Sequence, residues 1–183
     1  GSSTVSNTDG DMTSTVRVNQ SAGFSIVTYT GTGSAGSIAH GLGGTPEVMI
    51  IKNRSEAHSW SGTYHHKMAS DPETDYLNLS GTSGVVDDST IWNDTAPTST
   101  VFTVGTASNT GSSDNFVGYF FRGIEGYSKF GSYIGNGSAD GPYVHLGFKP
   151  AWLMVKEASA SGEDWMMWDN KRATHNEVFS HLY

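Results

Sequence analysis

Histidine and carboxylate side chains are the groups in this sequence most suited to acid–base or metal chemistry. Seven histidines are present: His40, His58, His65, His66, His145, His175 and His181. Only His65 and His66 are adjacent, and neighbouring residues of a strand point to opposite faces, which makes them poor joint ligands. The acidic clusters at 9–11, 71–75 and 87–88 lack the spacing of a helix-loop-helix calcium site. We therefore expect loop and surface roles for these residues, with no metal and no cofactor.

Motifs for nucleophilic or phosphate chemistry are missing. The chain has no cysteine, and no serine lies in a Gly-x-Ser-x-Gly elbow. The glycine-rich segments "GTGSAG" and "GNGSADG" lack the Lys-Ser/Thr ending of a phosphate loop. A glycosidase would need two carboxylates that face each other across a cleft, and the 18 acidic residues show no local signature for such a pair. We expect a protein that is not an enzyme, with a polysaccharide depolymerase as an alternative.

Aromatic residues in polar surroundings suggest binding chemistry instead. A tryptophan or tyrosine ring can stack on the apolar face of a sugar while amides and carboxylates bond the hydroxyls. Segments such as "AHSWSG" and "IWNDT" have this composition. The candidate ligand-binding residues are Trp60, Tyr64, Trp92, Asn93, Asp94 and Trp165. The alternative is that these rings pack in the core, and alternation in "DWMMWD" requires about half of that stretch to be buried.

Short strands must position these side chains. The sequence has 23 glycines, five Trp, eight Tyr and eight Phe, and only 15% charged residues, which favours an all-β protein with many turns. Apolar runs of strand length cover residues 24–30, 47–53, 76–79, 100–105, 115–122, 128–134, 151–157 and 164–169. "STVFTVGT" and "DNFVGYFF" flank a polar loop, which predicts a hairpin. "EVMIIK" and "AWLMVK" predict central strands covered on both faces. Single helical turns are possible at 67–69 and 172–178.

Residues 28–52 and 132–156 repeat one pattern at a constant offset of 104 positions. Matched residues include Gly31 with Gly135, Leu42 with Leu146, Pro46 with Pro150 and Lys52 with Lys156. Turn glycines and a proline before an apolar strand specify a backbone path. The fold prediction is an antiparallel β-sandwich, jelly-roll or concanavalin-like, with an internal repeat of about 104 residues.

The repeat also predicts the domain organisation. Residues 1–22 are expected to be a linker or extended segment, 23–126 a first sandwich unit, and 127–183 a partial second unit. The partial unit either packs on the first or continues beyond the chain end, because a half unit alone would leave sheet edges unpaired.

Charge and hydropathy exclude two kinds of partner. The net charge of −8 argues against nucleic acid, whose phosphates require a basic surface. The sequence contains no apolar run of the roughly 18 residues that a membrane span needs.

Three segments resemble a repeat family of structural proteins in marine tailed bacteriophages. They are "GFSIVTYTGTGSAGSIAHGLGGTPEVMIIKNRS", "WNDTAPTSTVFTVGT" and "GYSKFGSYIGNGSADGPYVHLGFKPAWLMVKE", and the resemblance covers residues 22–178. It implies a location in the virion, in a tail fibre or on the particle surface, often beside laminin-G-like or concanavalin-like segments. It also implies a homo-oligomer, expected to be a trimer, but it brings no agreed binding or catalytic residues.

These observations predict a non-enzymatic module on the virion surface, in a tail fibre or spike, that binds a host cell-surface glycan. The main alternative is a capsid-decoration or tail-scaffold protein that contacts other virion proteins.

Overall fold

The computed structural model describes residues 3–60, 62–108 and 110–171, which form twelve strands and two short 3-10 helices. The helices are η1 (Gln20–Ala22) and η2 (Pro72–Thr74). The strands are β1 (Val5–Asn7), β2 (Ser14–Asn19), β3 (Phe24–Thr30), β4 (Gly36–Ala39), β5 (Val48–Asn53), β6 (Gly62–His65), β7 (Asp75–Tyr76), β8 (Val86–Asp87), β9 (Val101–Val104), β10 (Asn115–Phe121), β11 (Trp152–Val155) and β12 (Met166–Asp169).

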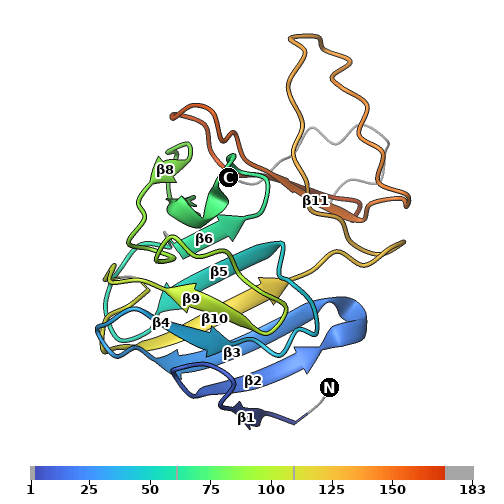
Figure 1. Ribbon diagram of the computed structural model, residues 1–183. Helices are drawn as coiled ribbons and strands as arrows, with labels where there is room; N and C mark the ends of the chain where they lie inside the picture. Colours follow the sequence, from blue (N-terminus) through green and yellow to red (C-terminus); the bar gives the residue numbers. More distant parts are fainter. Residues whose placement is uncertain (1–2, 61, 109, 172–183) are drawn as a thin grey trace.

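Six strands form the main sheet in the order β1-β2-β3-β10-β5-β6, and every neighbouring pair is antiparallel. Alternate residues of each strand face inward, as Ser25, Val27 and Tyr29 do in β3. The antiparallel pair β4–β9 lies over the inner face of this sheet (Figure 1). The all-β antiparallel sandwich predicted from the short apolar runs is therefore confirmed.

Aromatic side chains fill the space between the two layers. Tyr29 stacks on Phe116 with ring centroids 5.1 Å apart and meets Phe102 edge-on at 5.8 Å. Phe102 also contacts Phe120 at 4.6 Å. All four rings are less than 5% exposed, so they account for a large part of the buried apolar area.

Two local predictions about strands are wrong. Residues 101–104 and 115–121 do not form a hairpin, because β9 pairs with β4 and β10 pairs with β3 and β5. β5 is a central strand as predicted, paired with β10 and β6, but it is buried on one face and partly exposed on the other. β11 carries two exposed and two half-buried residues. An unbroken apolar run therefore did not indicate burial on both faces.

The structure also differs from the predicted boundaries. Residues 1–22 were expected to be a linker or extended segment, but β1 and β2 within them belong to the main sheet. The predicted strand at 128–134 is absent, with a single bridge between Ile124 and Ser128. Residues 67–69 form only a turn, and the helical turn expected at 172–178 lies outside the described residues.

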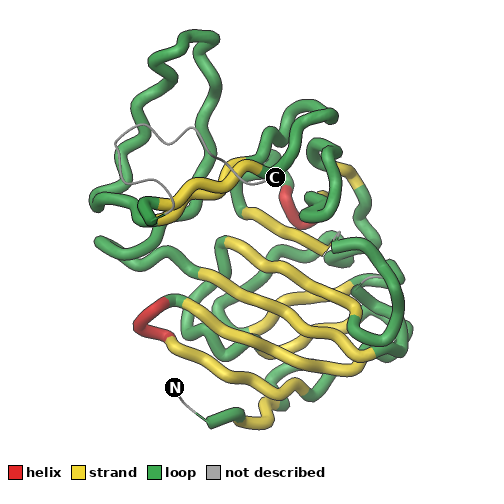
Figure 2. The backbone as a smooth tube through the Cα atoms, turned by 180° about the vertical axis from the view of Figure 1, so that it is seen from behind, coloured by secondary structure: helices red, strands yellow, loops and turns green. Residues whose placement is uncertain are grey.

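A separate hairpin, β11–β12, follows a long excursion from the end of β10 (Figures 1 and 2). It contacts the loop at 78–85 through backbone atoms. Val85 donates its N–H to Ala158 O at 2.9 Å, and Gly162 donates to Thr82 O at 2.9 Å. The indole N–H of Trp165 donates to Asn78 O, also at 2.9 Å.

Gly84 sits at the centre of this contact, where a Cβ atom would lie 2.7 Å from Ala160 O and 2.8 Å from Ala158 O. We expect Gly84→Ala to weaken the hairpin contact by about 1 kcal/mol or more, as overpacking does elsewhere. Hydrogen exchange should then show faster exchange of the β11 and β12 amides. Gly131→Ala is the control, because no atom lies within 4 Å of its Cβ. Equal exchange rates in the two variants would contradict the prediction.

Candidate functional site

Two of the predicted ligand-binding rings are part of the core. Trp92 is 1% exposed and Tyr64 is 4% exposed. Their rings meet edge-on at 6.0 Å, and the indole N–H of Trp92 donates to Asp75 O at 2.8 Å. Burial, followed by the charge of Glu73, raises the pKa of Tyr64 to about 12. Neither ring is available to stack on a ligand at the surface, so their predicted role does not agree with the structure.

Trp60 and Trp165 lie on either side of the loop at 78–80 and are both half-buried. Trp60 donates its N–H to Ser80 Oγ at 3.2 Å and accepts at its carbonyl from Leu79 N at 2.7 Å. The amine of Lys52 lies 5.9 Å from the centre of the Trp60 ring, within the range of a cation–π contact. Trp165 packs against the main core.

Asn93 and Asp94 form an exposed turn directly after Trp92. Both have left-handed backbones, with φ of 57° and 47°, and they are the only non-glycine residues with positive φ among those described. Asn and Asp tolerate this conformation better than other side chains. Asp94 donates its N–H to Ser89 O at 3.2 Å, which fixes the turn. The structure therefore gives these residues a turn role and does not bring them together with Trp60.

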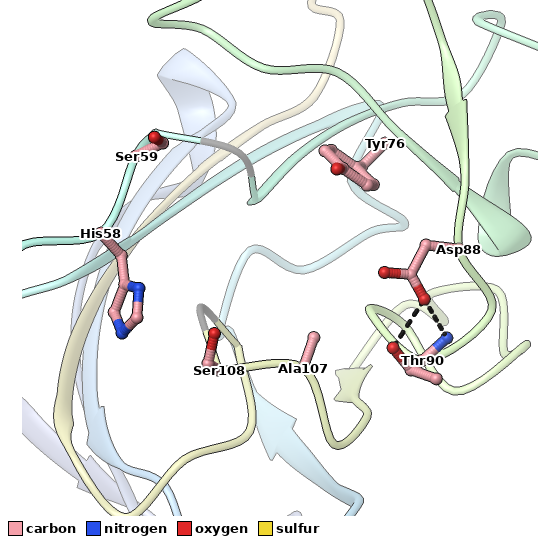
Figure 3. A pocket seen from close by; sticks show the side chains of 7 residues that line it. All are labelled: His58, Ser59, Tyr76, Asp88, Thr90, Ala107 and Ser108. Carbon is pink, nitrogen blue, oxygen red and sulfur yellow. Dashed lines mark hydrogen bonds between the residues drawn. The ribbon is translucent and has the colours of Figure 1, made fainter.

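An open cavity of about 390 Å³ lies where the loops at 58–59, 88–90 and 107–108 meet β7 (Figure 3). Its lining comes from sequence positions far apart in the chain: His58, Ser59, Tyr76, Asp88, Thr90, Ala107 and Ser108. The lining is mainly polar, with three hydroxyl side chains of Ser and Thr, one carboxylate, one imidazole and one phenol. This volume and composition suit a sugar ring, whose hydroxyls need donors and acceptors on several sides.

Asp88 is held in a fixed orientation at the cavity wall. Its Oδ1 accepts from the Thr90 N–H at 3.0 Å and from the Thr90 hydroxyl at 2.6 Å. The other carboxylate oxygen points toward the open space between Tyr76 and Ser108 (Figure 3). A positioned carboxylate makes charge-assisted hydrogen bonds, which are about twice as strong as neutral ones.

The opposite wall is held by Lys52. Its amine donates to His58 O at 2.9 Å and to Asn53 O at 2.8 Å, which ties the loop after β5 to the strand end. Beneath this loop Asp114 accepts from the side chains of Asn53 and Ser112. These hydrogen bonds, with a smaller contribution from the charge of His58, lower the pKa of Asp114. The loop that carries His58 is therefore tied to the sheet by side-chain bonds.

Sequence reasoning missed this cavity because its members have no common local pattern. Four separate segments supply them. Three look like ordinary polar turns, and the fourth, with Tyr76, begins a predicted strand. The one available signal was "DDST" at 87–90, in which an Asp side chain can bond the backbone two residues later.

A family model described as a domain of unknown function, DUF7483, matches residues 1–183. The chain belongs to the DUF7483 family. No curated protein and no solved structure matches it. The DUF7483 domain therefore has to be understood from its own residues.

The described residues of this DUF7483 domain lack two features. No group of three or more His, Asp or Glu side chains in this part of the chain could hold a metal ion. No helix there is long and apolar enough to cross a membrane.

Proposed function

We propose that this domain is a non-enzymatic, glycan-binding module of a virion surface, in a tail fibre or spike. The observation that carries the proposal is the polar cavity between His58 and Asp88. It offers a fixed carboxylate, several hydroxyls and the ring of Tyr76, which together match the mixed polar and apolar surface of a sugar. Trp60 follows Ser59 of the cavity wall directly in the chain, but it is not among the residues that line the cavity.

Binding is favoured over cleavage by the number of carboxylates. Asp88 is the single carboxylate among the seven residues that line the cavity. Most glycosidases use two, one as acid and one as base or nucleophile. The virion location rests on the resemblance of the repeated segments to phage structural proteins and on the rigid, glycine-punctuated sandwich that carries the cavity.

Nuclear magnetic resonance titration with a panel of hexoses, amino sugars and host lipopolysaccharide oligosaccharides tests the proposal. We expect millimolar affinity for at least one sugar, with shifts concentrated on the amides of 58–60, 88–90 and 107–108. Asp88→Asn keeps an acceptor for Thr90 and should weaken binding about tenfold, because it replaces a charge-assisted bond. Asp94→Asn changes an exposed carboxylate outside the cavity and is the matched control.

Failure of every sugar to shift these amides, with the protein folded, would refute the glycan-binding role. An equal loss of sugar affinity in the Asp88→Asn and Asp94→Asn variants would show that binding does not use the cavity.

A scaffold function is the second candidate, and one observation favours it. Large apolar side chains are exposed in the C-terminal half, including Ile134 at 90% and Tyr143 at 89%. Large apolar side chains with this degree of exposure are available to contact another protein.

A further inference from the structure

The β11–β12 hairpin reproduces the strand pairing of β5–β6. In the first hairpin Val48 faces His65, and in the second Trp152 faces Asp169, each residue 104 positions further along. The other three pairs shift by the same amount: Met49↔Tyr64 becomes Leu153↔Trp168, Ile50↔Thr63 becomes Met154↔Met167, and Ile51↔Gly62 becomes Val155↔Met166. A shift of one residue would turn every side chain to the other face, so identical register is a specific agreement.

Hydrogen bonds at both ends of the hairpins agree as well. His66 donates its N–H to Glu47 O at 2.9 Å, and 104 positions later Asn170 donates to Ala151 O at 3.0 Å. The lysine at the end of each strand bonds the carbonyl of the next residue, Lys52 to Asn53 O at 2.8 Å and Lys156 to Glu157 O at 2.9 Å.

The turn glycines before the two hairpins also share their backbone conformation. All four have positive φ: Gly33 at 79°, Gly137 at 67°, Gly43 at 74° and Gly147 at 83°. The two segments therefore follow one local design.

The two hairpins differ in what lies beside them. The second edge of β5 pairs with β10 over six residue pairs, from Phe116↔Asn53 to Phe121↔Val48. Among the described residues β11 pairs with β12 alone. The two hairpins also differ in exposure: Met49 is 1% exposed, whereas its counterpart Leu153 is 44% exposed.

Exposure extends to the segment that corresponds to β3. Tyr29 in β3 is 4% exposed, whereas Tyr133, 104 positions later, is 53% exposed. In the main sheet β10 lies between β3 and β5. A strand of the β10 kind is thus the element that would cover both exposed regions of the second copy.

We propose that the free edge of β11 binds one added strand of the β10 type. That strand is rich in aromatic residues, as in "NFVGYFF", and runs antiparallel to β11 in the register that β10 adopts on β5. The β10 of this chain already pairs on both edges, so the occupant is a second strand of the β10 type. Main-chain bonds to the free edge would supply affinity, and the exposed apolar side chains would supply specificity. The proposal does not depend on glycan binding.

A labelled peptide of residues 114–122, added to the whole chain, tests the idea by fluorescence anisotropy and hydrogen exchange. We expect binding that protects the amides of 151–156 and leaves the protection of β5 unchanged. A peptide of the same composition in scrambled order is the control for non-specific aromatic contact. Analytical ultracentrifugation without peptide reports any self-association.

Met154 provides a blocking variant. Arg54 donates its backbone N–H to Asn115 O across the β5–β10 pairing. In an antiparallel pair the N–H groups of alternate residues point to the same neighbour, so those of residues 52, 50 and 48 also point toward β10. Met154 is the counterpart of Ile50, and its N–H points to the free edge, where proline is tolerated in edge strands. Met154→Pro should weaken peptide binding at least tenfold, whereas Met154→Ala keeps the N–H and should stay within about threefold.

Three results would overturn the proposal. They are no peptide binding by the folded chain, protection located away from β11, and equal binding by the Met154→Pro and Met154→Ala variants. Self-association through the β11 edge in the absence of peptide would also overturn it, because the occupant would then be β11 of a second copy.

Discussion

Gly31→Ala is expected to lower the free energy of unfolding by about 3 kcal/mol or more, well above the typical point mutation. Gly31 follows β3 directly and donates its N–H to Asp114 O at 2.9 Å. A Cβ atom there would overlap the carbonyl oxygen of Ser112 and would lie 3.0 Å from the Phe116 ring. Both obstacles belong to packed parts of the molecule, since Phe116 is fully buried and the loop that holds Ser112 is bonded to Gly31. Urea denaturation at constant pH measures the change.

Gly135→Ala is the matched control for this substitution. Gly135 lies 104 positions after Gly31 in the repeated sequence, but a Cβ atom there meets no atom within 4 Å. Its replacement should change stability by no more than about 0.5 kcal/mol, and the loss of backbone freedom in the unfolded chain favours a slight gain. Similar destabilisation in both variants would show that the repeated glycine has the same surroundings in both copies.

The strands could be predicted largely because burial alternates along them. Residues 24–30 and 115–122 match β3 and β10 almost residue for residue, since both strands have one buried face and short, polar boundaries. The predicted hairpin at 100–121 failed for a different reason. Both β9 and β10 are good strands, but their partners lie more than 60 residues away in β4 and β5, and periodicity does not report which strands pair.

The candidate site was less predictable than the fold. Trp92 sits in the polar sequence "IWNDT", which indicated exposure, yet the carbonyl of Asp75 satisfies its indole N–H and allows the ring to be buried. Trp60 has equally polar neighbours and stays half-buried. Its backbone bonds Leu79 N–H and Ser80 Oγ, and the amine of Lys52 lies near its ring. Local composition does not distinguish these cases, because the deciding hydrogen-bond partner is distant in the sequence.

Acidification from pH 6.5 toward 4 is expected to destabilise the fold through two neutral histidines. His40 is fully buried, and its Nδ1 accepts the Leu42 N–H at 3.1 Å while Nε2 lies 3.2 Å from Thr98 O. The tautomer that satisfies both contacts carries its proton on Nε2, and a second proton on Nδ1 would face the Leu42 N–H. Burial lowers the pKa of His40, and the bond to Thr98 opposes this only in part.

His65 is affected in the same direction. Burial and then the neighbouring charge of His66, whose ring centre is 5.2 Å away, lower its pKa from 6.5 to about 4. As the pH falls, the two histidines become protonated near pH 6.5 in the unfolded chain and only at lower pH in the folded chain. The stabilisation is therefore complete above pH 6.5 and is lost as the pH falls toward 4. For His65 the loss is at most about 3 kcal/mol, at 1.36 kcal/mol per unit of pKa, and solvent exposure reduces it.

Asp75 acts in the opposite direction. Burial, together with the charges of Asp71, Asp87 and Glu73, raises its pKa, so protonation there adds stability as the pH falls. This gain offsets part of the loss that the histidines cause.

His65→Asn isolates the histidine contribution to this pH dependence. Asn retains an acceptor for the Lys67 N–H, which bonds His65 Nδ1 at 3.0 Å, but it does not titrate. We expect the variant to lose less stability than the native chain between pH 6.5 and 4 in urea denaturation, while His145→Asn, which removes an exposed histidine, leaves the profile unchanged. If His145→Asn flattened the profile and His65→Asn did not, exposed groups would govern the acid response, and the buried histidines would be protonated in the folded state as readily as in the unfolded chain.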